Sequence, residues 1–209
     1  MKRRQIVLAI ESAISGGSLS LIRDGAEVSH WIGSASVSKA EELLANIDAM
    51  LRSTGVSKNE ISMVAVSAGP GSFTGIRIGI ATALGFKNGL GIEMSSVTAL
   101  TAMAAAAEVR GSLIVAVPTG RNAICIQEFK NDGDLLPVSE PHTITEEAFA
   151  ETLCAEQGIH FVLHGSLFTD IDASITITNA GVNIAQSIGR YCTARPPVVT
   201  EPLFISKSF

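Results

Sequence analysis

The chain has 209 residues, a formal net charge of −5, 46% hydrophobic residues and only 5% aromatic residues. This length and composition allow a sizeable core in one large domain or two small ones, packed mainly by Ala, Ile, Leu and Val. The acidic balance, without clusters of Lys or Arg, excludes a strong nucleic-acid binder acting alone, because phosphate contacts dominate that affinity.

The cysteines and the apolar runs argue against a disulfide-stabilised, zinc-binding, secreted or membrane-spanning protein. Cys125, Cys154 and Cys192 form neither a CxxC pair nor a zinc-ligand spacing. Their odd number disfavours a disulfide framework, so we expect reduced, mostly buried thiols. The apolar run near the N-terminus is short for a secretory signal, and no apolar stretch reaches transmembrane length. We therefore expect a cytoplasmic protein that does not enter a membrane.

Two similar α/β halves are predicted. In the first half we expect strands at 5–11, 18–23, 26–32, 61–67 and 92–96, and helices at 37–53, 74–89 and 98–108. In the second half we expect strands at 113–117, 123–129 and 161–163, and helices at 145–156 and 181–193. Asp24-Gly25 between two apolar runs indicates a hairpin. The repeated order predicts two lobes, 1–109 and a smaller 110–209; the alternative is a generic α/β protein whose halves are alike by chance.

The glycine-rich loop after the strand at 61–67 is the most informative segment. It reads Gly69-Pro70-Gly71-Ser72-Phe73-Thr74-Gly75-Ile76-Arg77-Ile78-Gly79. Ser72 and Thr74 are candidate N-caps for the helix that follows. A helix N-terminus of this kind can bind an anion such as phosphate.

A structural role for this loop is the second interpretation. Gly75, Gly79 and Ala83 repeat every four residues, so that another helix backbone can approach closely. Arg77 lies in the first helical turn, where the helix dipole disfavours a cation. We expect it to have an anionic partner, either a carboxylate of this chain or a group on a bound protein.

The run GPGSFTGIRIG resembles the signature of the TsaB family, also called YeaZ or glycoprotease-like. The segments 6–11, 39–51, 89–100 and 201–204 are similar to further elements of that family. The resemblance implies a two-lobed actin-like ATPase fold of the ribonuclease H-like type, with a reduced second lobe. It also implies an accessory subunit of the bacterial tRNA threonylcarbamoyladenosine machinery. The old protease label does not indicate peptidase chemistry.

The chain has only part of the residue set that actin-like enzymes use to bind a nucleotide. Actin-like enzymes place an acidic residue at the end of the first strand to hold Mg–phosphate, and Glu11 occupies that position; alternatively, Glu11 caps the turn to Ile14. Thr119-Gly120-Arg121 stands where TsaB relatives carry Asp-Ala-Arg, so only Arg121 matches. We assign no nucleotide-binding residues and expect no cofactor on this chain alone, with ATP or ADP entering only in an assembled complex.

No metal site or catalytic residue is expected. His160 and His164 have a helical ligand spacing, but the apolar run between them predicts a strand, which separates them by about 13 Å. Lys39 and Leu43 stand where the related enzyme TsaD carries its metal-binding histidines. Cys125 and Cys154 have no histidine nearby in sequence, and Ser72 is not in a G-x-S-x-G elbow.

The resemblance implies that the helices at 37–53 and 74–89 pack side by side and bind the catalytic subunit TsaD. The same surface would support a homodimer when the chain is alone, the ATPase TsaE would join the complex, and tRNA would be contacted only indirectly. The predicted interface residues are Leu43, Leu44, Ile47, Ile76, Gly79, Ile80 and Ala83. Gly79→Leu is expected to block assembly. The alternative function is a small actin-like-fold ATPase or kinase acting on its own.

Overall fold

The structure is a computed structural model that describes residues 5–14, 16–34, 39–120, 122–155, 158–167 and 175–204. Arg121 and the side chain of Lys39, both singled out from the sequence, lie outside this description.

The first sheet is built by the strands of the N-terminal half. Its strands are β1 (Ile6–Glu11), β2 (Ser18–Arg23), β3 (Ala26–Ile32), β4 (Met63–Ser67) and β5 (Glu93–Val97), in the order β3-β2-β1-β4-β5. Strands β1, β2 and β3 are antiparallel, whereas β1, β4 and β5 run parallel. The accompanying helices are α1 (Lys39–Thr54), η1 (Lys58–Glu60), α2 (Phe73–Leu90) and α3 (Ala99–Ala106).

The second sheet repeats this plan, which confirms the predicted repeat. Its strands are β6 (Gly111–Gly120), β7 (Ala123–Asn131), β8 (Leu135–Pro137), β9 (His142–Ile144), β10 (His160–Leu163) and β11 (Ile177–Asn179), in the order β11-β10-β6-β7-β8, with β9 also on β7. The helices are α4 (Glu146–Ala155), η2 (Gly165–Leu167) and α5 (Ile184–Thr193). The short strands β8, β9 and β11 were not predicted, because three residues are too few to show a strand period.

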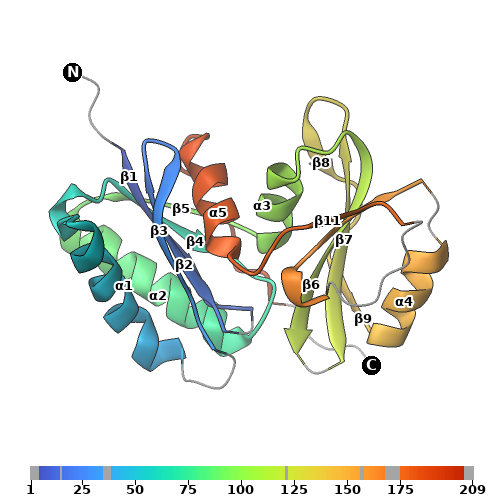
Figure 1. The fold of residues 1–209 in the computed structure, drawn as a ribbon, viewed down its shortest axis with the longest axis horizontal. Helices are drawn as coiled ribbons and strands as arrows, with labels where there is room; N and C mark the ends of the chain where they lie inside the picture. Colours follow the sequence, from blue (N-terminus) through green and yellow to red (C-terminus); the bar gives the residue numbers. More distant parts are fainter. Residues whose placement is uncertain are drawn as a thin grey trace.

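Helices and sheets alternate in layers (Figure 1). Helices α1 and α2 cover the outer face of the first sheet, α3 and α5 lie between the two sheets, and α4 covers the outer face of the second sheet. Strand β1 is buried on both faces, as its continuous apolar sequence indicates. Leu8 and Ile10 belong to the core beneath α1 and α2, whereas Val7 and Ala9 belong to the core around α3 and α5.

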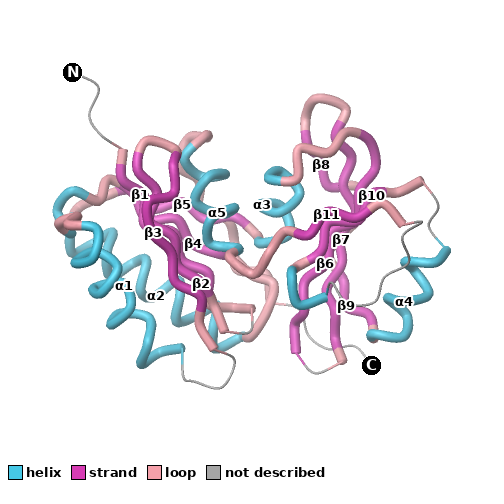
Figure 2. The backbone as a smooth tube through the Cα atoms, in the orientation of Figure 1, coloured by secondary structure: helices cyan, strands magenta, loops and turns pink. Residues whose placement is uncertain are grey.

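The central helices cross between the lobes. Helix α3 follows the first sheet in the chain but packs on β6, β7 and β8, whereas α5 follows the second sheet and packs on β1, β2, β4 and β5. Figure 2 shows both helices between the two sets of strands. Gly189 allows the close approach of α5, because a Cβ there would lie 2.4 Å from Cδ1 of Ile22 and 2.9 Å from Cβ of Ala9. The division at 109/110 therefore describes the order of the chain and stays a prediction, while one core joins both halves.

The first lobe also provides the cap for α5. Asn183 is the N-cap residue but makes no side-chain capping bond, and the backbone N–H of Ala185 donates to Oγ of Ser18 at 3.0 Å. The Glu27 carboxylate accepts from Nδ2 of Asn183 at 2.9 Å and from Nε2 of Gln186 at 3.0 Å. A carboxylate at a helix N-terminus is favourable, so the hairpin β2–β3 fixes the start of α5.

Candidate functional site

The glycine-rich loop connects β4 to α2, as predicted. Ser72 is the N-cap, with extended backbone angles, and its Oγ accepts from the N–H of Gly75 at 3.3 Å. Ser72 therefore performs the predicted capping role, and Thr74 does not. Helix α2 ends at Gly91, whose positive φ of 64° forms the left-handed C-cap.

The glycines of the loop receive other parts of the same chain. A Cβ at Gly71 would lie 2.4 Å from the carbonyl oxygen of Ala13, and a Cβ at Gly75 would lie 2.1 Å from that of Ser12. The Ser12 hydroxyl donates to the carbonyl of Gly75 at 2.8 Å. The loop and the first turn of α2 therefore pack tightly against the turn that follows β1.

Several amide donors of the loop are also used within the chain. The N–H of Gly69 donates to Oγ of Ser67 at 3.1 Å, and the N–H of Ser72 donates to the carbonyl of Ala13 at 2.7 Å. The N–H of Ile76 donates to the carbonyl of Ser72 at 2.9 Å. A phosphate cradle needs such donors to point at the ligand. The structural interpretation of the loop is therefore favoured over the phosphate interpretation.

Glu11 has the capping role that was one of its two interpretations. It is 1% exposed, and its Oε1 accepts from the N–H of Ala13 at 2.5 Å and of Ile14 at 2.9 Å. In the second lobe, Thr119 is half-buried and its hydroxyl donates to the carbonyl of Ala123 at 3.3 Å. Both positions therefore make local contacts that stabilise turns.

The two histidines with ligand spacing bind different neighbours. His160 lies in β10 with Nε2 2.7 Å from Oγ1 of Thr178, whereas Nδ1 of His164 lies 2.8 Å from Oγ of Ser166. Burial lowers the pKa of His164 to about 4, so this imidazole is neutral at pH 7. Within the described parts of the chain, no three His, Cys, Asp or Glu side chains are grouped so that they could hold a metal ion.

The three thiols are free. Cys125 and Cys192 are buried, and Cys154 is exposed on α4. Burial raises the pKa of Cys125 to about 12, and burial also raises the pKa of Cys192. Both buried thiols are therefore protonated at neutral pH, which is the opposite of an activated nucleophile.

Arg77 stacks on an aromatic ring. Its guanidinium carbon lies 3.9 Å from the ring centroid of Phe73, and that ring lies 4.6 Å from the ring of Phe204. The expected carboxylate of the chain itself is not found, since among the described residues Arg77 forms no ion pair. A group on a bound protein remains the predicted partner.

Most residues predicted at the partner interface are buried inside the free chain, and their role in binding a partner stays a prediction. The buried positions are Leu43, Ile47, Ile76, Gly79 and Ala83. Leu44 is 59% exposed, and Ile80 is half-buried. A Cβ at Gly79 would lie 2.4 Å from Oγ of Ser12, so the close neighbour of this glycine within the chain is the turn after β1.

An apolar groove lies instead on the outward sides of α1 and α2, which pack side by side as predicted. We call it the α1–α2 groove; it has a volume of about 530 Å³ and is lined by Leu44, Lys58, Ala81, Thr82, Gly85, Phe86, Gly89 and Leu90. A Cβ at Gly85 or at Gly89 would meet nothing within 4 Å. Leu44, Lys58 and Phe86 also line an adjoining hollow of about 400 Å³ that reaches Val56.

A second small-residue repeat in the sequence marks this groove. Ala81, Gly85 and Gly89 repeat every four residues, as Gly75, Gly79 and Ala83 do. Both sets are small-residue stripes of one helix. The turn after β1 closes one stripe, and the other stripe remains open.

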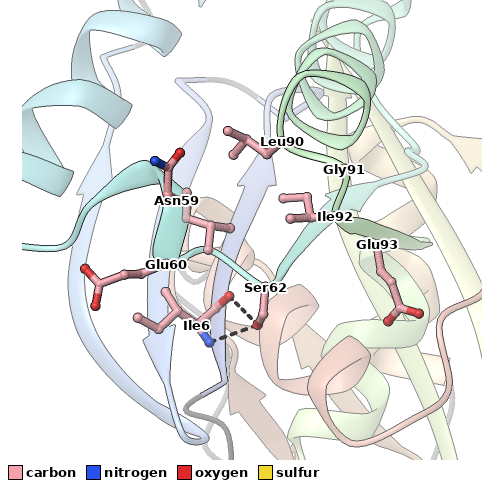
Figure 3. A pocket seen from close by; sticks show the side chains of 9 residues that line it. Ile6, Asn59, Glu60, Ser62, Leu90, Gly91, Ile92 and Glu93 are labelled. Atoms are coloured by element: carbon pink, nitrogen blue, oxygen red, sulfur yellow. Dashed lines mark hydrogen bonds between the residues drawn. The ribbon is translucent and has the colours of Figure 1, made fainter.

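A further pocket lies at the end of the first sheet that is opposite to the glycine-rich loop (Figure 3). It has a volume of about 590 Å³ and is lined by Ile6, Asn59, Glu60, Ile61, Ser62, Leu90, Gly91, Ile92 and Glu93. Oγ of Ser62 bonds the backbone N–H and carbonyl of Ile6 at 3.0 and 2.9 Å. The pocket is at the amino ends of the parallel strands, whereas α/β sheets bind ligands at the carboxyl ends. The signature loop and Glu11 lie at those carboxyl ends.

None of the helices, as far as the structure describes them, has the length and apolar character to cross a membrane.

Comparison with known proteins agrees with the fold. The family model described as "TsaD: tRNA N6-adenosine threonylcarbamoyltransferase" matches residues 34–157, more than half of the chain. The structure is similar to "YeaZ from Pseudomonas aeruginosa", with a TM-score of 0.64 and 17% identity over 91% of this chain and 92% of that one. The chain is therefore a two-lobed α/β protein with the actin-like ATPase fold.

Curated proteins with similar sequences are named TsaB. The tRNA threonylcarbamoyladenosine biosynthesis protein TsaB of Haemophilus influenzae is 34% identical over 101 residues, which are 48% of this chain and 42% of that protein. TsaB of Escherichia coli is 35% identical over 98 residues, 47% of this chain and 42% of that protein. The match thus spans less than half the length of these relatives. The chain belongs to the TsaB (YeaZ) family.

Proposed function

We propose that the chain is a non-catalytic accessory subunit that binds a TsaD-type threonylcarbamoyltransferase through the α1–α2 groove. Its role would be to support formation of threonylcarbamoyladenosine in tRNA, the process in which its TsaB relatives are named. The groove is the observation that carries this proposal, because it is apolar, exposed and built by the two helices that the family resemblance singles out.

The shape of the groove suits another helix. Ala81, Gly85 and Gly89 form its floor, and Gly85 and Gly89 have no neighbour where a side chain would begin. A partner backbone can therefore come close to α2. Leu44 and Leu84, 59% and 41% exposed, add apolar area at α1 and α2. Burial of such side chains is the main favourable term in association.

The net charge of the chain and its family membership support a proposal for the wider assembly. Since the chain has a net charge of −5, the tRNA would be held by the catalytic subunit, and this chain would contact it only indirectly. We also propose that a TsaE-type ATPase joins the complex, that ATP or ADP binds only there, and that the assembly works in the cytoplasm. When the catalytic subunit is absent, the same groove would pair two copies of this chain.

The internal contacts of the loop support a non-catalytic role. Glu11 and several loop amides bond to the chain's own turns, which leaves little of the equipment that an independent ATPase or kinase needs. Tight binding of ATP by the purified chain alone would instead favour that alternative.

Complex formation tests the proposal. The chain is mixed with the TsaD-type subunit of the same organism, and the mass of the eluting species is measured by light scattering. We expect a stable heteromer for the unmodified chain. Gly85→Leu should fold normally, because its side chain enters open space and leucine favours a helix by about 0.8 kcal/mol over glycine. It should lower the affinity at least about tenfold by filling the groove.

Gly79→Leu is the matched variant on the closed stripe of α2. It should destabilise the fold by roughly 1–3 kcal/mol or more, because the new side chain collides with Ser12. A second pair separates groove from core in the same way: Leu44→Asp should weaken binding in a folded chain, whereas Ile47→Asp should unfold it. Full binding by folded Gly85→Leu and Leu44→Asp would contradict the proposed surface.

A further inference from the structure

The last described segment of the chain lies along the edge of the first sheet. The carbonyl of Val198 accepts from the N–H of Ser96 at 2.8 Å and from Oγ of Ser95 at 3.1 Å. The N–H of Thr200 donates to Oγ of Ser96 at 2.7 Å, and its hydroxyl donates to the carbonyl of Ser96 at 2.8 Å. Residues 198–204, which we call the C-terminal strap, are therefore fixed to the end of β5.

The C-terminal strap then reaches the signature loop. The N–H of Leu203 donates to the carbonyl of Ala68 at 2.7 Å, and a Cβ at Gly69 would lie 2.7 Å from the carbonyl oxygen of Leu203. Gly69 has a φ of +100°, a backbone angle that residues with a side chain rarely adopt. The first glycine of the signature thus accommodates the strap, and not a ligand.

Together, strap and helix form an exposed cluster at the start of α2. Phe204 of the strap packs against the ring of Phe73. The guanidinium carbon of Arg77 lies 3.9 Å from the centroid of the same Phe73 ring. Phe73 is 49% exposed and Phe204 is 45% exposed, and Arg77 is exposed as well. Large aromatic rings at such exposure, beside an arginine, have the composition of an interface hot spot.

The charges of this cluster indicate what it binds. The first turn of α2 contains no acidic residue, and Arg77 has no carboxylate among the described residues. A cation at a helix N-terminus is unfavourable until an anion neutralises it. Stacking on Phe73 fixes the plane of the guanidinium and leaves its N–H edges free for bidentate bonds, a geometry that matches a carboxylate.

We propose that Phe73, Arg77 and Phe204 form a second recognition patch, which binds a carboxylate-bearing apolar segment of the TsaD-type subunit. This inference rests on the proposed function and deepens it, since the α1–α2 groove supplies helix packing and the patch supplies a charged anchor. The patch and the groove share one face of α2, because Arg77, Ala81 and Gly85 of this helix follow one another at intervals of four residues.

Binding of the TsaD-type subunit is measured by titration calorimetry at low and at high salt, with Arg77→Gln, Phe204→Ala and the double variant. Each single change should weaken binding about tenfold at low salt. The salt dependence should fall in Arg77→Gln and in the double variant but not in Phe204→Ala. The effects of the two single changes should be non-additive, since the stack couples both side chains. Arg77→Lys, which keeps the charge but loses the planar fork, should fall between the wild type and Arg77→Gln.

The matched controls are Arg190→Gln, which removes an exposed cation from α5, and Leu136→Ala, which removes an exposed apolar side chain from β8. Both should bind as the wild type does, and thermal unfolding should show that all variants are folded. If the patch variants bind normally while Gly85→Leu does not, the patch is wrong and the proposed function stands. If they disrupt only self-association, the occupant is a second copy and the inference is wrong as stated. If the unmodified chain does not bind the TsaD-type subunit at all, both proposals fail.

Discussion

Single residues show how the same residue type serves opposite purposes on one helix. Gly75 and Gly79 let α2 press against the turn after β1, whereas Gly85 and Gly89 leave its outer side open. The spacing of four residues predicts small-residue stripes in both cases. Only the position of Ser12, brought there by β1, decides which stripe is closed.

The buried imidazole of His164 gives a prediction at the residue scale. Burial lowers its pKa from 6.5 to about 4, and its Nδ1 accepts from the N–H of Ser166 at 3.2 Å, a bond that needs the unprotonated nitrogen. Between these two pKa values the unfolded chain binds more protons than the folded chain. The free energy of unfolding should therefore decrease as the pH falls from about 6.5 to 4, by at most about 3 kcal/mol from this residue.

Urea unfolding at pH 7 and at pH 4.5 measures this effect. His164→Asn retains an acceptor near the N–H of Ser166 but cannot titrate, so it should lose this part of the pH dependence. His160→Asn, on the more accessible histidine of β10, is the control and should change it less. An identical pH dependence in His164→Asn and the wild type would show that this histidine is not the source.

At the scale of elements, the two halves share a sheet plan but not a full set of helices. Strand β4 ends at Ser67 and β5 begins at Glu93, whereas β10 ends at Leu163 and β11 begins at Ile177. About half as much chain connects the second pair, and its described residues contain only η2 there. Helix α2 alone has 18 residues, and a loop is needed at each of its ends. A helix of that length does not fit in the connection between β10 and β11. The signature loop and the proposed docking helix consequently occur once.

Helix α5 depends on a cap from another element. Ser18 is fully buried, and its Oγ accepts from the N–H of Ala185. Ser18→Ala should lower the free energy of unfolding by roughly 1–3 kcal/mol, because a buried N–H is left without an acceptor. Chemical denaturation measures the change. Ser29→Ala on β3 is a matched control, since that hydroxyl makes no hydrogen bond within the described chain; equal losses in both variants would contradict the cap.

At the scale of the whole molecule, the lobes are joined by exchange of their central helices. Helix α3 covers the second sheet and α5 covers the first, so each half completes the core of the other. Val7 and Ala9 of the first half share one cluster with Val115 and Val117 of the second half. The chain should behave as one cooperative unit with a single unfolding transition.

Separate expression of residues 1–109 and 110–209 tests this coupling. Each fragment alone should fail to fold, because the inner face of its sheet loses the helix that covers it. Mixing the two fragments during refolding should restore the circular dichroism and the cooperative melting of the intact chain. Two fragments that each melt cooperatively on their own would show that the halves are independent domains.

The sequence by itself determined the order of most strands and helices, the repeat, the start of a helix in the glycine-rich loop and the family. These features depend on local chemistry: apolar period, turn residues and the glycine-rich loop. It did not determine the crossing of α3 and α5, the attachment of the C-terminal strap to Gly69, or which side of α2 is open. Those features depend on contacts between residues far apart in the chain, such as Ser12 with Gly79 and Leu203 with Gly69. A periodic pattern shows that a face is apolar or small, but only packing in three dimensions decides what covers it.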